Sequence, residues 1–88
     1  MDKKVYNYRI LVEKEKTKQG VVFVSYVPTL GISDFGKTID ETVLNTEKAI
    51  KIYLKTQASL KREIPQQDND EYFIVNKKVE LNYPNAAA

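Results

Sequence analysis

The chain has no cysteine and no histidine among its 88 residues. It therefore has no disulfides, thiolate nucleophiles or imidazole bases, and it lacks the two ligand types that make most zinc sites. Long apolar runs are also missing. No stretch approaches 18 apolar residues, and the N-terminus has no apolar signal-peptide core. We therefore expect a cytoplasmic protein that is neither secreted nor membrane-spanning.

Glycine and proline are scarce, with three of each, while 42% of the residues are hydrophobic and 30% are charged. This composition is typical of a soluble globular protein. A chain of 88 residues has room for one small core, so we expect a single domain over residues 1–81 and a disordered tail over 82–88. The 14 basic and 12 acidic residues are mixed along the chain, which indicates a solvated surface and not a clustered basic patch.

Three segments have the pattern of β-strands. From Val5 to Glu13 apolar and polar residues alternate, which predicts a strand with one buried face. Val21 to Val27 is almost continuously apolar, and the polar stretch Lys14 to Gly20 between them predicts the turn of an antiparallel hairpin. After a turn at Pro28, Ile32 to Phe35 predicts a third, short strand.

A helix is predicted to begin at Thr38, because Thr38 and Glu41 have the spacing of a capping box. At 100° per residue, Thr42 and Ala49 fall at the edge of the predicted sheet-covering face. The centre of that face holds Ile39, Val43, Thr46, Ile50, Tyr53, Leu54 and Gln57. On the opposite side, Leu44 and Ile52 are candidate contact positions for a partner or a second copy.

The helix should end between Ala58 and Glu63, before Pro65, and a last strand is predicted over Tyr72 to Leu81. The fold class is therefore α+β: a two-layer sandwich of order β-β-β-α-β, with a three- to four-stranded, mainly antiparallel sheet and one helix on one face. The second sheet face has no cover in this arrangement. We expect self-association into a dimer or larger homo-oligomer to bury it.

The segment from Val27 to Leu54 resembles the central signature of the HicB family of antitoxins. The matching residues are Pro28, Leu30, Gly31, Gly36, Thr38, Glu41, Asn45, Ala49, Tyr53 and Leu54. The resemblance implies a truncated ribonuclease-H-like sheet. Local rules for each residue type make these matches structural: glycines for turns, Thr38 and Glu41 for capping, Ala49 for close packing.

Three departures from that family pattern stand out. One residue that is common between Leu30 and Gly31 is missing, and Thr42 replaces a common alanine, which would place a hydroxyl near the sheet. Family members that repress their own operons carry a C-terminal DNA-binding segment, and the residues after Leu81 do not provide one. DNA binding by this chain alone is therefore not expected.

The resemblance implies a non-catalytic antitoxin that neutralises a small, basic, RNA-cleaving toxin by occlusion. Acidic groups should then face the partner, and Asp68, Asp70 and Glu71 form the densest acidic run. Two-metal nuclease chemistry is disfavoured because the candidate acids are poorly placed for it. Glu13 and Glu15 are assigned to a hairpin end, Asp40 and Glu41 to the helix start, and Asp68, Asp70 and Glu71 to a polar loop. We therefore predict no catalytic, cofactor-binding or metal-binding residues.

Two alternatives remain open from the sequence. A stand-alone HicB-like domain without a toxin would act as an oligomeric structural or regulatory protein. A nucleic-acid binder would use the basic N-terminal region together with two tyrosines. Its residues would be Lys3, Lys4, Tyr6, Tyr8, Arg9, Lys14, Lys16 and Lys18.

Overall fold

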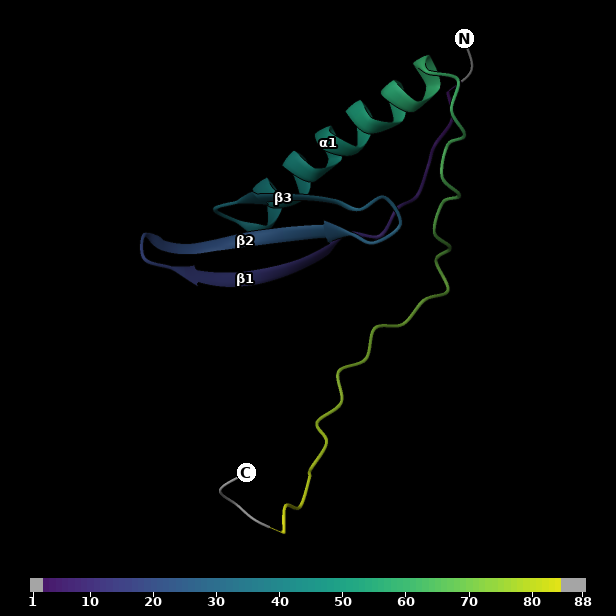
Figure 1. Cartoon of the computed structure of the whole chain (residues 1–88). Coiled ribbons are helices and arrows are strands. Elements are labelled where there is room, and N and C mark those ends of the chain that lie inside the picture. Colours follow the sequence, from purple (N-terminus) through teal and green to yellow (C-terminus); the bar gives the residue numbers. More distant parts are fainter. Residues whose placement is uncertain (1–2, 85–88) are drawn as a thin grey trace.

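The computed structural model describes residues 3–84. Three antiparallel strands, β1 (Leu11–Thr17), β2 (Gly20–Val27) and β3 (Ile32–Gly36), form one sheet in the order β1-β2-β3. A single helix, α1 (Ile39–Ser59), crosses one face of this sheet (Figure 1). The predicted α+β class with one helix on one sheet face is confirmed.

The β1–β2 hairpin is tighter than the sequence pattern predicts. Thr17 pairs with Gly20, so only Lys18 and Gln19 form the turn, and the Thr17 hydroxyl accepts a hydrogen bond from the Gln19 N–H. The first strand begins at Leu11, so the expected start at Val5 is wrong. The charged stretch Lys14 to Thr17 belongs to the strand because pairing with β2 satisfies its backbone while its side chains stay in water.

A reverse turn after Val27 joins β2 to β3. The Val27 carbonyl accepts hydrogen bonds from the N–H groups of Leu30 and Gly31, at 3.2 and 2.8 Å. Gly31 has a φ of 69°, in the left-handed region that glycine adopts without steric cost. The turn places Ile32 opposite Val27 and Phe35 opposite Val24.

Both ends of α1 are capped as local sequence rules require. The Thr38 hydroxyl accepts from the Glu41 N–H at 3.0 Å, and the Glu41 carboxylate accepts from the Lys37 N–H at 3.3 Å. At the other end, the N–H groups of Lys61 and Arg62 donate to carbonyls of the last turn, in the pattern of a Schellman motif. Lys61 adopts a φ of 56° to make this turn. The predicted helix bounds are confirmed.

The contact between α1 and the sheet is mostly polar. The fully buried side chains among residues 3–84 are Val27, Ser25, Thr42 and Thr46. Thr42 donates to the Phe23 carbonyl at 3.1 Å, so the hydroxyl expected near the sheet does contact it.

The predicted sheet-covering face of α1 is confirmed along most of the helix and wrong at its start. Thr46 is buried as expected, and Ile50, Tyr53, Leu54 and Gln57 are half-buried. Ile39 and Val43 were expected at its centre but are 53% and 38% exposed, whereas Thr42, expected at the edge, is buried. The Thr42 hydroxyl can be buried there because it lies within hydrogen-bonding distance of carbonyls in the helix and in the sheet, which the hydrophobic pattern alone did not detect.

The predicted last strand over Tyr72 to Leu81 does not form part of the sheet. After α1 the chain passes beside the N-terminal segment and then projects away from the body of the molecule (Figure 1). We call residues 72–84 the arm. Of the expected disordered tail over 82–88, residues 85–88 lie outside the described residues. Within residues 3–84, no helix is both long and apolar enough to cross a membrane.

Candidate binding surfaces

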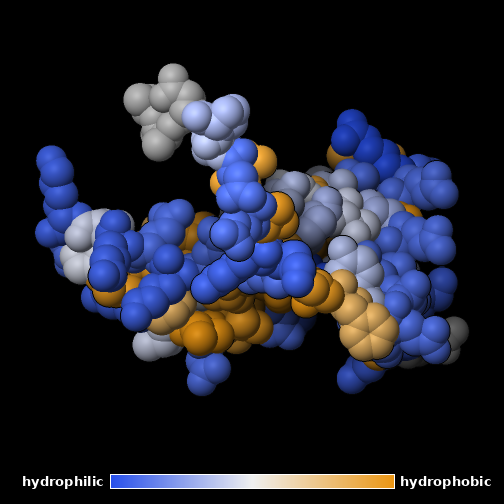
Figure 2. Space-filling view, turned by 90° about the horizontal axis from the view of Figure 1, so that it is seen from below, coloured by the Kyte–Doolittle hydropathy of each residue, from blue (hydrophilic) through white to orange (hydrophobic). Residues whose placement is uncertain are grey.

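The sheet face opposite α1 is apolar with an acidic margin. Register places Glu13 opposite Val24 and Glu15 opposite Val22, so both carboxylates share this face with the apolar side chains. We define the outer sheet face as Leu11, Glu13, Glu15, Val22, Val24, Tyr26, Ser33 and Phe35. Seen from below the sheet, hydrophobic residues gather together on the surface (Figure 2). Tyr26 and Phe35 are 48% and 64% exposed, so none of the described residues covers this face completely.

The centre of the outer sheet face is hollowed. Leu11, Tyr26 and Ser33 are among the residues that line a cavity of about 300 Å³ there. Glu13 also borders this cavity, which brings an acidic group next to an apolar depression. Sequence analysis identified the uncovered face but not its acidic margin, because Glu13 and Glu15 were assigned to a hairpin end and not to a paired strand.

A second cluster joins the two ends of the chain. We call the contact between residues 7–9 and residues 65–72 the terminal clamp. The Asp68 N–H donates to the Asn7 carbonyl at 2.8 Å, and the Asn7 side-chain amide donates to Asp70 Oδ1 at 2.9 Å. The Arg9 guanidinium lies 3.3 Å from the centroid of the Tyr72 ring, which is a cation–π contact.

Asp68 is the centre of the terminal clamp. Its carboxylate accepts from the Thr29 hydroxyl at 2.6 Å and from the Arg9 N–H at 2.7 Å, and its side chain is 15% exposed. The Thr29 hydrogen bond, followed by that from the Arg9 backbone, holds the pKa of Asp68 below its usual value, although burial opposes this shift. Asp68 therefore serves an internal contact in this structure.

The other two members of the acidic run differ from Asp68. Asp70 contacts Asn7, whereas Glu71 is exposed and has no hydrogen bond within the described residues. The structure therefore does not bring the three acids together as one outward-facing patch. On α1, the predicted contact residues Leu44 and Ile52 are 50% and 67% exposed. They remain accessible, although Lys48, Lys51 and Lys55 on the same helix are exposed as well.

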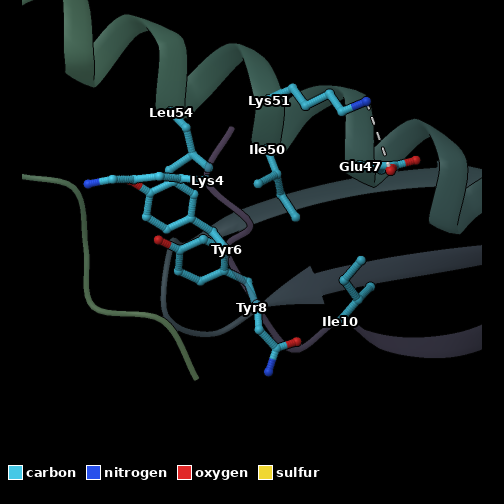
Figure 3. Close-up of a pocket in the computed structure, with 9 residues that line it drawn as sticks. Lys4, Tyr6, Tyr8, Ile10, Glu47, Ile50, Lys51 and Leu54 are labelled. Carbon is cyan, nitrogen blue, oxygen red and sulfur yellow. Dashed lines mark ion pairs between the residues drawn. The ribbon is translucent and has the colours of Figure 1, made fainter. Parts of the chain in front are cut away.

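A groove runs between α1 and the N-terminal segment (Figure 3). Tyr6 and Tyr8 stack with ring centroids 6.4 Å apart, and Ile50 and Leu54 of α1 help to line a cavity of about 300 Å³. Burial, with smaller effects from Tyr6, Asp68 and Tyr53, raises the pKa of the Tyr8 phenol, whose hydroxyl donates to the Pro65 carbonyl. Tyr8 therefore packs inward, whereas Tyr6 is 38% exposed.

The basic residues suggested for nucleic-acid binding do not form one patch with those tyrosines. Arg9 is used by the terminal clamp, whereas Lys14, Lys16 and Lys18 lie on β1 and its turn. Lys4 alone among the predicted basic residues lines the groove of Tyr6 and Tyr8.

The signature residues hold the third strand against the helix. A Cβ built on Gly36 would lie 2.8 Å from both the N and the Oγ1 atoms of Thr42, so only glycine allows this approach. Asn45 donates to the Phe35 carbonyl at 2.8 Å. Gly31 makes a turn, Thr38 caps the helix, and Gly36 and Asn45 join β3 to α1. All four of these signature residues therefore have structural roles. Within residues 3–84, no group of three or more acidic side chains is arranged to hold a metal ion.

The structure thus defines a small α+β protein with one three-stranded antiparallel sheet and one helix. The chain belongs to the UPF0150 family: it is 30% identical over 67 residues to the UPF0150 protein ssr1765 of Synechocystis, and the match covers 75% of this chain and 81% of that protein. No family model matches the chain. No solved structure matches it either.

Proposed function

We propose that the chain is a HicB-like antitoxin-type binding module that neutralises a small, basic, RNA-cleaving toxin by occlusion. Two findings support the proposal. The signature from Val27 to Leu54 occupies the β3–α1 unit, and the chain belongs to UPF0150, a family that in general resembles HicB-like proteins. Occlusion requires complementary shape and charge and no reactive side chains.

The observation that carries the proposal is the outer sheet face. Its apolar centre can be buried against a partner, and Glu13 and Glu15 at its margin favour a basic one. The acidic run at Asp68 contributes less, because Asp68 is already satisfied by Thr29 and Arg9. The binding surface is therefore proposed on β1, β2 and β3.

Co-expression tests this proposal. Any small basic protein that a neighbouring gene encodes would be expressed in a bacterial host, with and without this chain, and growth arrest would be scored. Wild-type chain should restore growth and co-purify with the toxin. Phe35→Asp should abolish both effects, because a carboxylate would enter the apolar contact.

Leu44→Asp is the matched control, since Leu44 is also half-exposed but lies on α1. Leu44→Asp should restore growth and co-purify with the toxin as the wild-type chain does. Loss of protection by Leu44→Asp with full activity of Phe35→Asp would move the surface to the helix. Failure of the wild-type chain to bind or neutralise the neighbouring basic protein would remove the antitoxin proposal.

The second candidate function is a stand-alone oligomeric structural or regulatory domain. The large uncovered apolar surface favours it, since such a surface needs a partner of some kind. The discriminating result is a stable homo-oligomer from a gene that has no toxin gene beside it.

A further inference from the structure

The arm is an extended segment with one apolar side. Phe73, Val75 and Val79 lie on this side and are 89%, 79% and 82% exposed, with Lys77 among them, whereas Ile74 lies on the other side and is 62% exposed. Tyr72 makes a cation–π contact with Arg9. After it, no hydrogen bond joins residues 73–84 to the rest of the described chain. An extended strand with exposed apolar side chains and free backbone groups is a template for pairing with another strand.

The β1 edge is the more open of the two sheet edges. At the β3 edge, the Phe35 N–H donates to Asp34 Oδ1 and the Phe35 carbonyl accepts from Asn45, so side chains occupy both backbone groups. At the β1 edge, no described strand lies beyond β1. Alternate residues of β1 therefore direct unpaired N–H and C=O groups outward.

The terminal clamp already defines a register. Asp68 bonds to the Asn7 carbonyl, and the two segments run in the same direction, because Arg9 contacts Asp68, Asn69 and Tyr72. If the pairing of Asn7 with Asp68 continued in step along both segments, residues 72–78 would lie beside β1 (Leu11–Thr17), over the full length of that strand. The arm leaves this path at Tyr72, so the β1 edge of its own chain stays open.

We propose that the arm of each chain pairs with the β1 edge of a second copy, giving a reciprocal, arm-exchanged homodimer. The unpacked arm leaves enough surface for such pairing: the chain exposes 8141 Å², whereas a compact folded monomer of 10.1 kDa exposes about 5,300 Å². The excess of about 2,800 Å² is more than the roughly 800 Å² that each partner buries in a standard interface.

The projecting arm makes the chain extended. Its radius of gyration is 18.1 Å, against about 12 Å for a compact domain of 88 residues. An identical partner has the same open edge and the same unpaired arm, so the exchange closes after two copies. This inference does not depend on the proposed toxin binding.

Light scattering on the full-length chain at micromolar concentration gives the first test. The wild-type chain should have the mass of a dimer. Val75→Lys should shift it to a monomer, because in the proposed register the added charge lies beside Lys14. Asn76→Lys, which adds the same charge on the other side of the arm beside Glu15, should remain a dimer. The arm has no hydrogen bond to the described body, so neither variant should lose the circular dichroism of α1.

Cysteine cross-linking identifies the partner strand. Because the chain has no native cysteine, only the introduced thiols can form a disulfide. In the proposed register Lys16 lies beside Lys77. The double variant Lys16→Cys, Lys77→Cys should oxidise to a covalent dimer, whereas Lys55→Cys, Lys77→Cys should not. An intramolecular disulfide in the first variant would place the arm on its own β1 and overturn the proposal. So would a monomeric wild-type chain, or equally fast cross-linking of Lys77→Cys alone, which would place arm against arm.

Discussion

The hydroxyl oxygens of Ser25 and Thr46 lie 2.5 Å apart where β2 meets α1, and both side chains are buried. Thr46 also contacts the Thr42 carbonyl, and Ser25 contacts both backbone polar groups of Asp34. Hydrogen bonds therefore fix how the helix sits on the sheet, in a position where most small α+β domains use apolar contacts. This arrangement makes the position of α1 sensitive to the loss of single hydroxyl groups.

Thr46→Val should destabilise the protein by about 1–2 kcal/mol, because it removes a buried hydrogen bond without changing the side-chain volume much. Urea unfolding followed by circular dichroism measures this. Thr56→Val is the matched control: Thr56 makes the same type of bond to the carbonyl four residues earlier, but it is exposed. Its effect should stay within about 0.5 kcal/mol. Equal effects of the two variants would contradict a special role for Thr46.

Gly36→Ala should destabilise the protein by about 1–3 kcal/mol, because the added methyl group would overlap the start of α1 at Thr42. The free energy of unfolding should recover in part when Thr42→Ala is added, since one of the two close atoms is the Thr42 hydroxyl. Recovery should be incomplete because the backbone nitrogen stays in place. An unchanged stability in Gly36→Ala alone would show that the helix start can shift without cost.

Asp68→Asn should weaken the terminal clamp at neutral pH by about 1–3 kcal/mol, through loss of charge-assisted hydrogen bonds from Thr29 and Arg9. The pKa of Asp68 is lowered in the folded protein, so its stabilisation is complete above the unfolded value of about 3.9 and is lost as the pH falls below it. The difference in stability between wild type and Asp68→Asn should therefore shrink between pH 5 and pH 2, taken as rough limits from the same linkage.

Denaturant unfolding of both proteins across that range measures the difference. Glu71→Gln removes a nearby but exposed carboxylate and serves as the control. Glu71→Gln should leave the pH dependence of the free energy of unfolding as it is in the wild type. A gap between wild type and Asp68→Asn that stays constant down to low pH would contradict the assignment of Asp68 as the clamp's ionised acceptor.

Lys61→Gly should stabilise the protein by about 0.5–1 kcal/mol, because Lys61 closes the helix in a left-handed conformation that glycine adopts without steric cost. Thermal unfolding should show a higher midpoint. Lys55→Gly, inside α1, should have the opposite effect, of about 1 kcal/mol. A loss of stability in Lys61→Gly would show that the Lys61 side chain itself contributes to the helix end.

The amino-acid sequence alone determined the features that depend on neighbours along the chain. Thr38 with Glu41 predicted where α1 begins, Pro65 predicted its end, and the turn at Pro28 predicted the short third strand. These signals are local, because a cap or a turn is satisfied by groups within a few residues.

Only the tertiary structure decided the features that depend on distant partners. Thr42 is buried against the sheet because its hydroxyl can donate to the Phe23 carbonyl, although the hydrophobic pattern put it at the edge of the helix face. Asp68 points inward because Thr29 and Arg9 contact it there. The alternating pattern of the arm predicted a last strand, which does not form within the described residues. An alternating pattern indicates only that one side of a strand is apolar. Which neighbouring strand it hydrogen-bonds to is decided by the folded or assembled molecule.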